Sequence, residues 1–166
     1  MTDTGAPSAT GTVRIDAAPE AVYALITDLS ALADCAEETD TMRWVAGDSA
    51  RPGAKFTGSN SNGSHKWSTT CTVTDAEPGR TFGFDVRSAV IPVAHWAYEI
   101  TPVDGGCQVT ESTWDRRPRW IRGATRFVTG VADRTTANGE HIRLTLERLK
   151  KRAEGGTGGI VDGQKS

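Results

Sequence analysis

Two stretches in which apolar and polar residues alternate constrain the fold of this chain more than any other feature. Six bulky apolar side chains occupy every second position there: Phe82, Phe84, Val86, Trp96, Tyr98 and Ile100. A two-residue period is typical of a strand that buries one face and exposes the other. The Asp104-Gly105-Gly106 sequence that follows predicts a hairpin turn, because glycine accepts positive φ angles. The region therefore predicts antiparallel strands with an aromatic face that other elements must cover.

The rest of the chain up to Pro118 predicts further strands and two short helices. Alternation and turn signals mark four more strands, at Gly11–Asp16, Thr41–Ala46, Lys55–Asn60 and Lys66–Thr74. One helix begins near Pro19, since proline is tolerated in a first helical turn, and a second covers Ala31–Ala36. The connections are short, so neighbouring strands should pair antiparallel. About seven strands are expected in total.

After Pro118 the apolar residues recur at steps of three and four, as they do on one face of a helix. The stripe comprises Trp120, Ala124, Phe127, Val131, Thr135, Ile142, Leu146 and Leu149. It predicts one long C-terminal helix of about 30 residues. Gly123, Gly130 and Asn138-Gly139 interrupt the stripe, and each glycine costs a helix about 1 kcal/mol relative to alanine. A bend or a close backbone contact is therefore expected in this helix.

Length and composition indicate one domain, residues 10–152, with flexible termini at 1–9 and 153–166. A formal charge of −2 argues against nucleic-acid binding. The three cysteines are far apart and form no CxxC pair, which is typical of reduced thiols in the cytoplasm. Neither a signal peptide nor the roughly 18 consecutive apolar residues of a membrane span is apparent. We therefore expect a soluble cytoplasmic protein.

Several short motifs, taken in order, resemble those of a known superfamily. Asp16–Tyr23 (DAAPEAVY) is similar to the D-A-P-x-x-V opening of START-like SRPBCC proteins. Motifs similar to those of its polyketide cyclase/dehydrase-type members follow at Pro52–Phe56, Trp67, Glu77–Phe82, Trp96–Ile100, Gly105-Gly106 and Val109–Glu111. The resemblance covers residues 10–152, nearly the whole chain.

This resemblance implies an α+β helix-grip fold. In that fold a curved antiparallel sheet of about seven strands wraps around a long C-terminal helix, with two short helices between strands 1 and 2. A cavity lies between the sheet and the long helix. Members of the superfamily bind lipids, sterols, polyketides or other hydrophobic molecules there, and some cyclise or dehydrate aromatic polyketides. Such cavities need no cofactor and no metal.

The aromatic side chains of this chain either form the wall of such a cavity or fill the core. Those on the central strands and on the predicted helix are the better cavity candidates, because strand and helix face one another in the fold implied by the resemblance. The candidate ligand-binding residues are Trp67, Phe84, Trp96, Tyr98, Glu111, Phe127 and Val131.

Glu111 is the candidate catalytic residue, and its orientation is open. If Val109 and Thr113 point inward, so does Glu111; if Trp114 points inward, Glu111 faces solvent. A carboxyl group in an apolar cavity has a raised pKa and could act as a general acid or base, or anchor a ligand hydroxyl. His95 is out of phase with Trp96, so we expect it to face solvent. Three scattered histidines do not predict a metal site.

The segment from Arg116 to Arg152 is basic, with 11 of the 19 lysines and arginines of the chain. If the predicted helix is straight, five of these side chains lie opposite its apolar stripe: Arg119, Arg122, Arg126, Arg148 and Lys151. Either this face is simply solvated, or it docks an acidic acyl carrier protein or an anionic membrane surface.

Three hypotheses about function follow from these observations. The first is binding of a hydrophobic, ring-containing small molecule, lipid-like or polyketide-like, in the cavity between sheet and C-terminal helix. The second is an aromatic polyketide cyclase/dehydrase that positions a poly-ketone chain and moves protons with Glu111. The third is an interaction protein with a filled core. A cavity of a few hundred Å³ with a titratable group on its wall would favour the first two.

Overall fold

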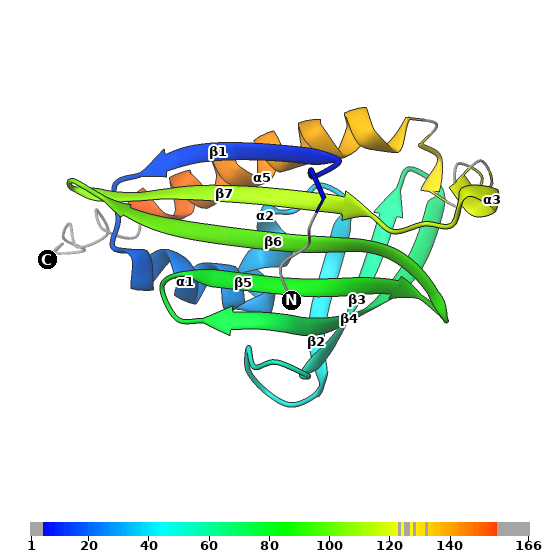
Figure 1. Ribbon diagram of the computed structural model, residues 1–166, viewed down its shortest axis with the longest axis horizontal. Helices are drawn as coiled ribbons and strands as arrows, with labels where there is room; N and C mark the ends of the chain where they lie inside the picture. Colours follow the sequence, from blue (N-terminus) through cyan, green and yellow to red (C-terminus); the bar gives the residue numbers. More distant parts are fainter. Residues whose placement is uncertain (1–4, 123, 125–126, 128, 132, 156–166) are drawn as a thin grey trace, which may run out of the picture.

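The computed structural model describes residues 5–122, 124, 127, 129–131 and 133–155, and its main feature is a seven-stranded antiparallel sheet (Figure 1). The strand order is β1-β7-β6-β5-β4-β3-β2, so only β1 lies beside a strand distant in sequence. The strands are β1 (Ala9–Ile15), β2 (Thr39–Ala46), β3 (Lys55–Asn62), β4 (His65–Glu77), β5 (Thr81–Ser88), β6 (Ile91–Val103) and β7 (Gly106–Asp115). The predicted helix-grip fold is confirmed.

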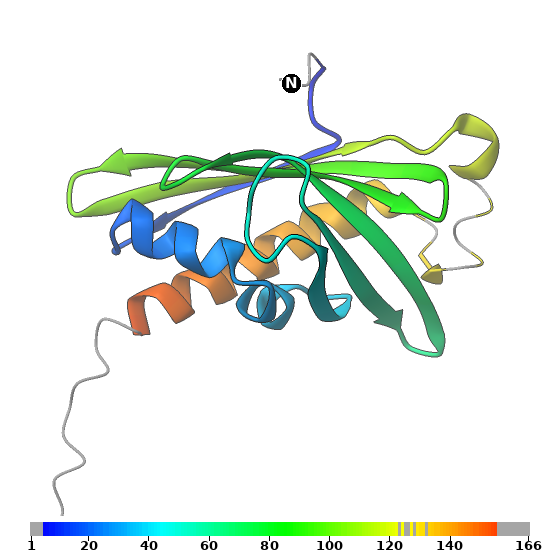
Figure 2. The same ribbon diagram turned by 90° about the horizontal axis from the view of Figure 1, so that it is seen from below.

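Three helices cover one face of this sheet, and residues 5–8 lie on the other face (Figure 2). The helices are α1 (Pro19–Thr27), α2 (Leu29–Cys35) and α5 (Arg134–Gly155). Pro19 stands in the first turn of α1, where its missing N–H costs nothing. The Asp28 side chain caps α2 by accepting hydrogen bonds from the backbone N–H groups of Ser30 and Ala31. These local signals place both short helices between β1 and β2, as predicted.

The core lies between the inner face of the sheet and the three helices. Alternation sets its composition, because Phe82, Phe84 and Val86 all point to this face of β5 and are buried. Phe84 packs edge-on against Phe56 of β3, with ring centroids 5.1 Å apart. The largest fully buried side chains include Phe56, Phe82, Ile15, Ile26, Ile142 and Leu149.

Helix α5 lies close to the sheet at Gly11 of β1. A Cβ atom at Gly11 would stand 2.7 Å from Cγ2 of Ile142, so the missing side chain is what lets helix and strand meet. Buried α5 residues are Ile142, Thr145, Leu146, Leu149 and Ala153, all in the part of the helix after its second turn. The first two turns instead present polar side chains to the interior, including Arg134 and Asn138.

The predicted continuous helix from Pro118 is wrong in its first half. A four-residue helix, α3 (Arg119–Arg122), is separated from α5, which begins only at Arg134. Trp120 is 79% exposed and Phe127 is 72% exposed, so these two members of the predicted stripe are not packed on the core. Gly130 has a φ of +72° and lies against His65, where an added Cβ would come within 3.0 Å of Nδ1. A bend within a continuous helix is therefore not found; of the two alternatives, the close contact occurs at Gly130, which lies outside α3 and α5.

The predicted flexible ends fall partly outside the described residues, which exclude 1–4 and 156–166. Residues 5–8 run along the outer face of β7: Trp114 Nε1 donates to the carbonyl of Gly5 at 2.8 Å, and the backbone N–H of Asp115 donates to Ser8 Oγ at 2.9 Å. At the other end, Ala153 is buried and belongs to α5. Among the described residues, no helix combines the length and the apolarity needed to cross a membrane.

The two glycines Gly11 and Gly139 should respond oppositely to alanine. Gly11→Ala forces the new methyl group against Ile142 and should destabilise the fold by roughly 1–3 kcal/mol. Gly139 lies inside α5 with nothing within 4 Å of an added Cβ, so Gly139→Ala should stabilise it by about 1 kcal/mol. Urea unfolding of the two variants measures both changes. Equal effects of the same sign would contradict the close approach of α5 to β1.

Candidate functional site

A cavity lies between the inner face of the sheet and the helices α2 and α5, in two adjoining chambers. The inner chamber, of about 150 Å³, reaches from α2 and the start of β2 to Glu111 on β7. The outer chamber, of about 270 Å³, extends towards the turn between β5 and β6 and towards α3. Six residues line both chambers and form what we call the neck: Trp67, Thr69, Val93, Trp96, Arg134 and Asn138. The core is thus not filled at this end of the molecule.

The structure brings together five of the seven candidate ligand-binding residues. Trp67, Phe84, Trp96, Tyr98 and Glu111 all line the inner chamber, and the two tryptophans also belong to the neck. Phe127 and Val131 are not in the wall of either chamber. Both lie between α3 and α5, where the helix that should have carried them inward is broken.

Glu111 points into the inner chamber and is 3% exposed. Val109 and Thr113 face inward with it, whereas Trp114 lies on the outer face of the sheet beside His95. On either side Glu111 is paired in register with Gly11 of β1 and Tyr98 of β6. The Tyr98 hydroxyl donates a hydrogen bond to Oε1 of Glu111 at 2.7 Å. Oε2 has no hydrogen-bond partner; among the described residues it is the one buried side-chain polar atom in this condition.

The surroundings of Glu111 favour its neutral form. Burial raises the pKa of this carboxyl to about 8, and the hydrogen bond from Tyr98 opposes that change only in part. Burial likewise raises the pKa of the Tyr98 hydroxyl, and the neighbouring Glu111 adds to the effect. The dyad of Tyr98 and Glu111 therefore carries both of its protons near neutral pH.

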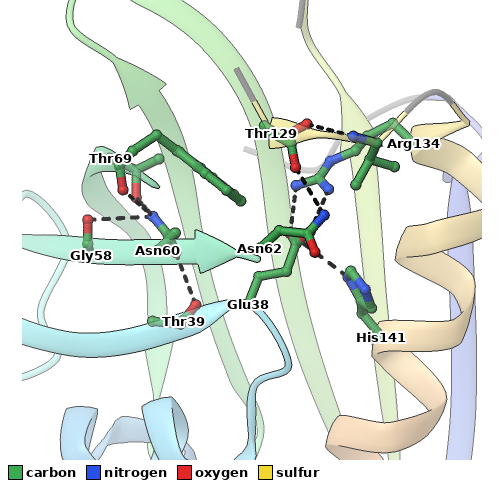
Figure 3. Close-up of polar contacts among 11 residues, drawn as sticks. Glu38, Thr39, Gly58, Asn60, Asn62, Thr69, Thr129, Arg134 and His141 are labelled. Atoms are coloured by element: carbon green, nitrogen blue, oxygen red, sulfur yellow. Dashed lines mark hydrogen bonds and ion pairs between the residues drawn. The ribbon is translucent and has the colours of Figure 1, made fainter. Parts of the chain in front are cut away.

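A polar cluster lines the inner chamber at the first turn of α5 (Figure 3). Arg134 donates from Nη1 and Nη2 to the two carboxylate oxygens of Glu38, at 2.9 Å and 2.7 Å. The His141 Nδ1 atom stands 3.9 Å from the same carboxylate. The Arg134 guanidinium also lies over the ring of Trp67, 5.9 Å from its centroid. This bidentate pair joins the start of β2 to α5 across the neck.

Two asparagines of β3 support this end of the cavity. Asn62 Nδ2 donates to the carbonyl oxygen of Thr129 at 2.9 Å, which ties the β3–β4 hairpin to the segment before α5. Asn60 is buried in the chamber wall; its Oδ1 accepts from Thr39 Oγ1 at 3.1 Å and its Nδ2 donates to Thr69 Oγ1 at 3.2 Å. Figure 3 shows these contacts beside the Glu38–Arg134 pair. Both the oxygen and the nitrogen of the Asn60 side-chain amide have hydrogen-bond partners within the protein, so the role of Asn60 is structural.

Sequence reasoning did not single out Glu38, Arg134 or Asn60. The Glu38–Arg134 ion pair joins residues 96 positions apart, and no local sequence pattern predicts it. A signal existed in the charge distribution, because the acidic run that includes Glu37 and Glu38 precedes a segment rich in arginine. Segments with opposite excess charge can form ion pairs where the fold brings them together, as the segment between α2 and β2 and helix α5 do here.

The basic residues of α5 are largely paired with acidic groups of the same chain. Arg148 pairs with Glu37 at 2.8 Å, and Arg152 with Asp34 at 3.0 Å. Arg143 bonds Glu140 and Glu147 on its own helix. Of the five residues predicted to form an outward basic face, Arg126 lies outside the described residues. Arg119 and Arg122 are exposed, but on α3, so a straight basic face along one helix does not form.

His95 is buried, 5% exposed, although the sequence predicted a solvent-facing side chain. It does lie on the outer face of the sheet, as its phase required, but Trp114 packs against it with ring centroids 5.4 Å apart. Its Nδ1 atom is 2.7 Å from Asp85 Oδ1. The prediction failed because alternation specifies a face and not whether another side chain covers that face.

The outer chamber contains a second polar pair, between Asp115 and Arg117. Arg117 donates to both carboxylate oxygens of Asp115, from Nε at 2.9 Å and from Nη2 at 2.7 Å. Burial acts to raise the pKa of Asp115, but these hydrogen bonds outweigh it and the pKa is lowered. Across the described residues, no three His, Cys, Asp or Glu side chains gather as ligands of a metal ion would.

A curved sheet gripping a long C-terminal helix over a cavity defines the class of helix-grip proteins. The family model described as polyketide cyclase / dehydrase and lipid transport matches residues 6–154. The chain belongs to this family, which confirms the resemblance to polyketide cyclase/dehydrase-type SRPBCC proteins. Its membership supports a role in binding a hydrophobic ligand or in polyketide cyclisation.

Solved structures with this fold include three that are informative. The Polyketide_cyc-like protein Cgl2372 from Corynebacterium glutamicum is 25% identical over 93% of this chain and 96% of its own, with a TM-score of 0.61. Protein CV1439 from Chromobacterium violaceum is 17% identical over 87% and 95%, with a TM-score of 0.66. The di-domain ARO/CYC StfQ of the steffimycin biosynthetic pathway is 11% identical over 90% of this chain and 51% of its own, with a TM-score of 0.69. No curated protein matches the chain significantly.

The buried carboxyl of Glu111 should make stability depend on pH. Its pKa is about 8 in the folded protein against a usual value of 4.5, so the folded state holds a proton that the unfolded state releases. Stability is then greatest below pH 4.5 as far as this group is concerned, and falls as pH rises towards 8. Glu111→Gln removes this pH dependence. As pH rises through this range, the free energy of unfolding of the variant should therefore increase relative to that of the wild type by up to about 1.4 kcal/mol per pH unit.

Urea unfolding at pH 5, 6, 7 and 8 measures this difference. Glu99→Gln is the matched control, because Glu99 follows Tyr98 on β6 and is exposed. Its stability relative to the wild type should not change with pH. A constant difference between Glu111→Gln and the wild type across the range would show that Glu111 is not buried in the way described.

Proposed function

We propose that the protein binds a hydrophobic, ring-containing small molecule, lipid-like or polyketide-like, in the cavity between the sheet and α5. The observation that carries this proposal is the neck, where Trp67 and Trp96 line both chambers. Aromatic walls are typical of sites for flat apolar ligands, because ring stacking adds to the burial of apolar surface. The hypothesis of a filled core loses its basis, since the core leaves space at this end.

The wall around the neck is mostly apolar, and its charged groups are already paired. Arg134 is held by Glu38, and Asp115 by Arg117, so neither pair offers an uncompensated charge to a ligand. A small ionic metabolite would have to break one of these pairs. A largely apolar molecule instead gains about 25 cal/mol for each Å² of apolar surface that it buries.

Blocking the neck tests this function. Val93 lines both chambers, and Val93→Trp should fill the space between them. Binding of a naphthalene-based fluorescent probe, measured by titration, should weaken by roughly tenfold or more, because a bulky side chain then competes for the same volume. Val90→Trp is the control, since Val90 is 83% exposed in the turn between β5 and β6. Equal affinity of Val93→Trp and the wild type would overturn the assignment of the cavity as the binding site.

A second candidate function is that of an aromatic polyketide cyclase/dehydrase. The observation that favours it is Glu111, a carboxyl in the inner chamber whose raised pKa, about 8, suits proton transfer near neutral pH. In this function the cavity holds a poly-ketone chain in a folded conformation, and Glu111 exchanges a proton with it. Positioning supplies much of the rate, so a single titratable group is enough.

Glu111→Gln, assayed with a poly-ketone thioester, tests this second candidate. The loss of a proton-transfer group should lower the cyclisation rate by about 10²–10⁴-fold. Binding of the naphthalene probe by the same variant serves as the control for an intact cavity. If cyclisation by the variant is as fast as by the wild type, Glu111 has no part in proton transfer.

We also propose a docking site for the acidic partner expected from the basic segment. Because Arg148 and Arg152 of α5 are paired with acidic groups, an acidic acyl carrier protein or an anionic membrane surface would meet α3 instead. Arg119 is exposed there, beside Ile121, which lines the outer chamber; Arg122 is also exposed, and its Nε lies 3.9 Å from Oδ2 of Asp115. The cavity would then exchange its ligand on the side of this partner.

A further inference from the structure

The geometry at the closed end of the inner chamber points to a narrower class of ligand. We infer that Glu111 is a neutral acid that donates a hydrogen bond from Oε2 into the chamber, and that the ligand is an uncharged molecule with a carbonyl-type oxygen placed there. This inference rests on the proposed function, because it assumes that the cavity holds a ligand. It adds the chemistry that the ligand must present.

The position of the proton follows from the hydrogen bond of Tyr98. A phenol hydroxyl donates to Oε1 of Glu111 at 2.7 Å, so Oε1 already serves as an acceptor. A neutral carboxyl group carries one proton, and the oxygen that accepts no hydrogen bond is Oε2. With the proton on Oε2, the pair forms a chain in which Tyr98 donates to Glu111 and Glu111 donates onward. No group of the described residues accepts a hydrogen bond from Oε2, so in this inference the next acceptor belongs to the ligand.

In the part of the chain that the structure describes, no cation interacts with Glu111 to hold it as a carboxylate. The titratable groups that interact with it electrostatically are Tyr98 on β6 and Cys35 on α2, and neither carries a positive charge. On β1 its register partner is Gly11. The other charged groups in the wall of this chamber are already paired: Arg134 with Glu38, beside His141, and Glu37 with Arg148. Burial disfavours an ionised carboxylate that has no cationic partner, so the acid stays neutral.

A buried donor without a partner discriminates between ligands, because a ligand that leaves it unpaired binds at a cost in free energy. A ligand that offers a ketone, quinone or ester oxygen at Oε2 completes the chain of hydrogen bonds. A ligand of the same shape without that oxygen leaves the donor unpaired in an apolar site, which is the situation that discriminates most strongly between analogues. For the cyclisation reaction, the same geometry makes Glu111 the group that polarises a ketone, because a protonated carboxyl cannot accept a proton from carbon.

Two naphthalene probes of nearly equal shape test the inference: 2-acetylnaphthalene, which has a C=O group, and 2-isopropenylnaphthalene, which has C=CH₂ in its place. At pH 7 the wild type should bind the ketone about threefold to tenfold more tightly than the alkene. Glu111→Leu should abolish this preference, while Glu111→Gln should keep part of it, because an amide still donates. The preference should fall above about pH 8 in the wild type and stay constant in Glu111→Gln, since Glu111 has a pKa of about 8.

A ligand-free measurement keeps the inference falsifiable if a variant folds poorly. The infrared spectrum of the wild type at pH 7 should contain the C=O stretch of a protonated carboxylic acid, and that band should be missing from Glu111→Gln. Its absence from the wild type would overturn the inference. So would tighter binding of the cationic probe 1-(2-naphthyl)ethylamine than of the ketone, because that result requires a carboxylate.

The same titrations separate this inference from the function on which it rests. If ketone and alkene bind equally well, the cavity binds rings as proposed but the donor role of Glu111 is wrong. If neither probe binds and Val93→Trp changes nothing, the proposed function fails, and the inference about its ligand fails with it.

Discussion

The apolar stripe of α5 ends partway along the helix, and the cavity exists because of this. In the later turns Ile142, Leu146 and Leu149 are buried, and Gly11 lets the helix lie close to β1. On the same face, one and two turns before Ile142, stand Asn138 and Arg134. Arg134 is held by Glu38 beside Trp67, and neither Arg134 nor Asn138 supplies an apolar side chain that would fill the space at the neck. The polarity of one helix face therefore decides where the core stops and the cavity begins.

Ion pairs then fix the width of the space that the helix leaves. Glu38 holds Arg134 at the rim, and Glu37 and Asp34 hold Arg148 and Arg152 further along α5. The outer two pairs are well exposed and add little to stability, but the Glu38–Arg134 pair is mostly buried and bidentate. A wall held in this way is formed before a ligand arrives, so binding costs less ordering of side chains.

The sequence predicted those parts of the fold that depend on local periodicity. Alternation located the strands, and Pro19 located the first helix within a few residues. It failed at residues 119–131, where Trp120 and Phe127 recur at helical spacing and yet are exposed. Nothing in that spacing tells a buried helical face from a broken helix. Gly130 has a φ of +72° and lies beside His65, a residue distant in the sequence.

Part of the candidate site was also predictable from local periodicity. Alternation predicted Trp67, Trp96 and Tyr98 for the cavity wall. It left the orientation of Glu111 open, because either set of alternate side chains on β7 could have pointed inward. What decides the matter is the pairing of β7 on both sides, which turns Val109 and Thr113 towards the helices. The rim pair of Glu38 and Arg134 was out of reach, because it links distant residues and only the folded chain brings them together.

Two polar side chains in the same chamber wall show how structure and function can be told apart there. Asn60 and Glu111 are both buried, and a buried polar group is tolerated when its hydrogen bonds are made. Both ends of the Asn60 amide are bonded to neighbouring residues, so it needs nothing from a ligand. Glu111 is bonded through Oε1 alone, and its second oxygen is buried without a hydrogen-bond partner. A buried polar atom without a hydrogen bond lowers the stability of the folded protein. Proteins tolerate such groups mainly at functional sites. The unmet hydrogen bond of Glu111, more than the size of the cavity, therefore gives this site its chemical selectivity.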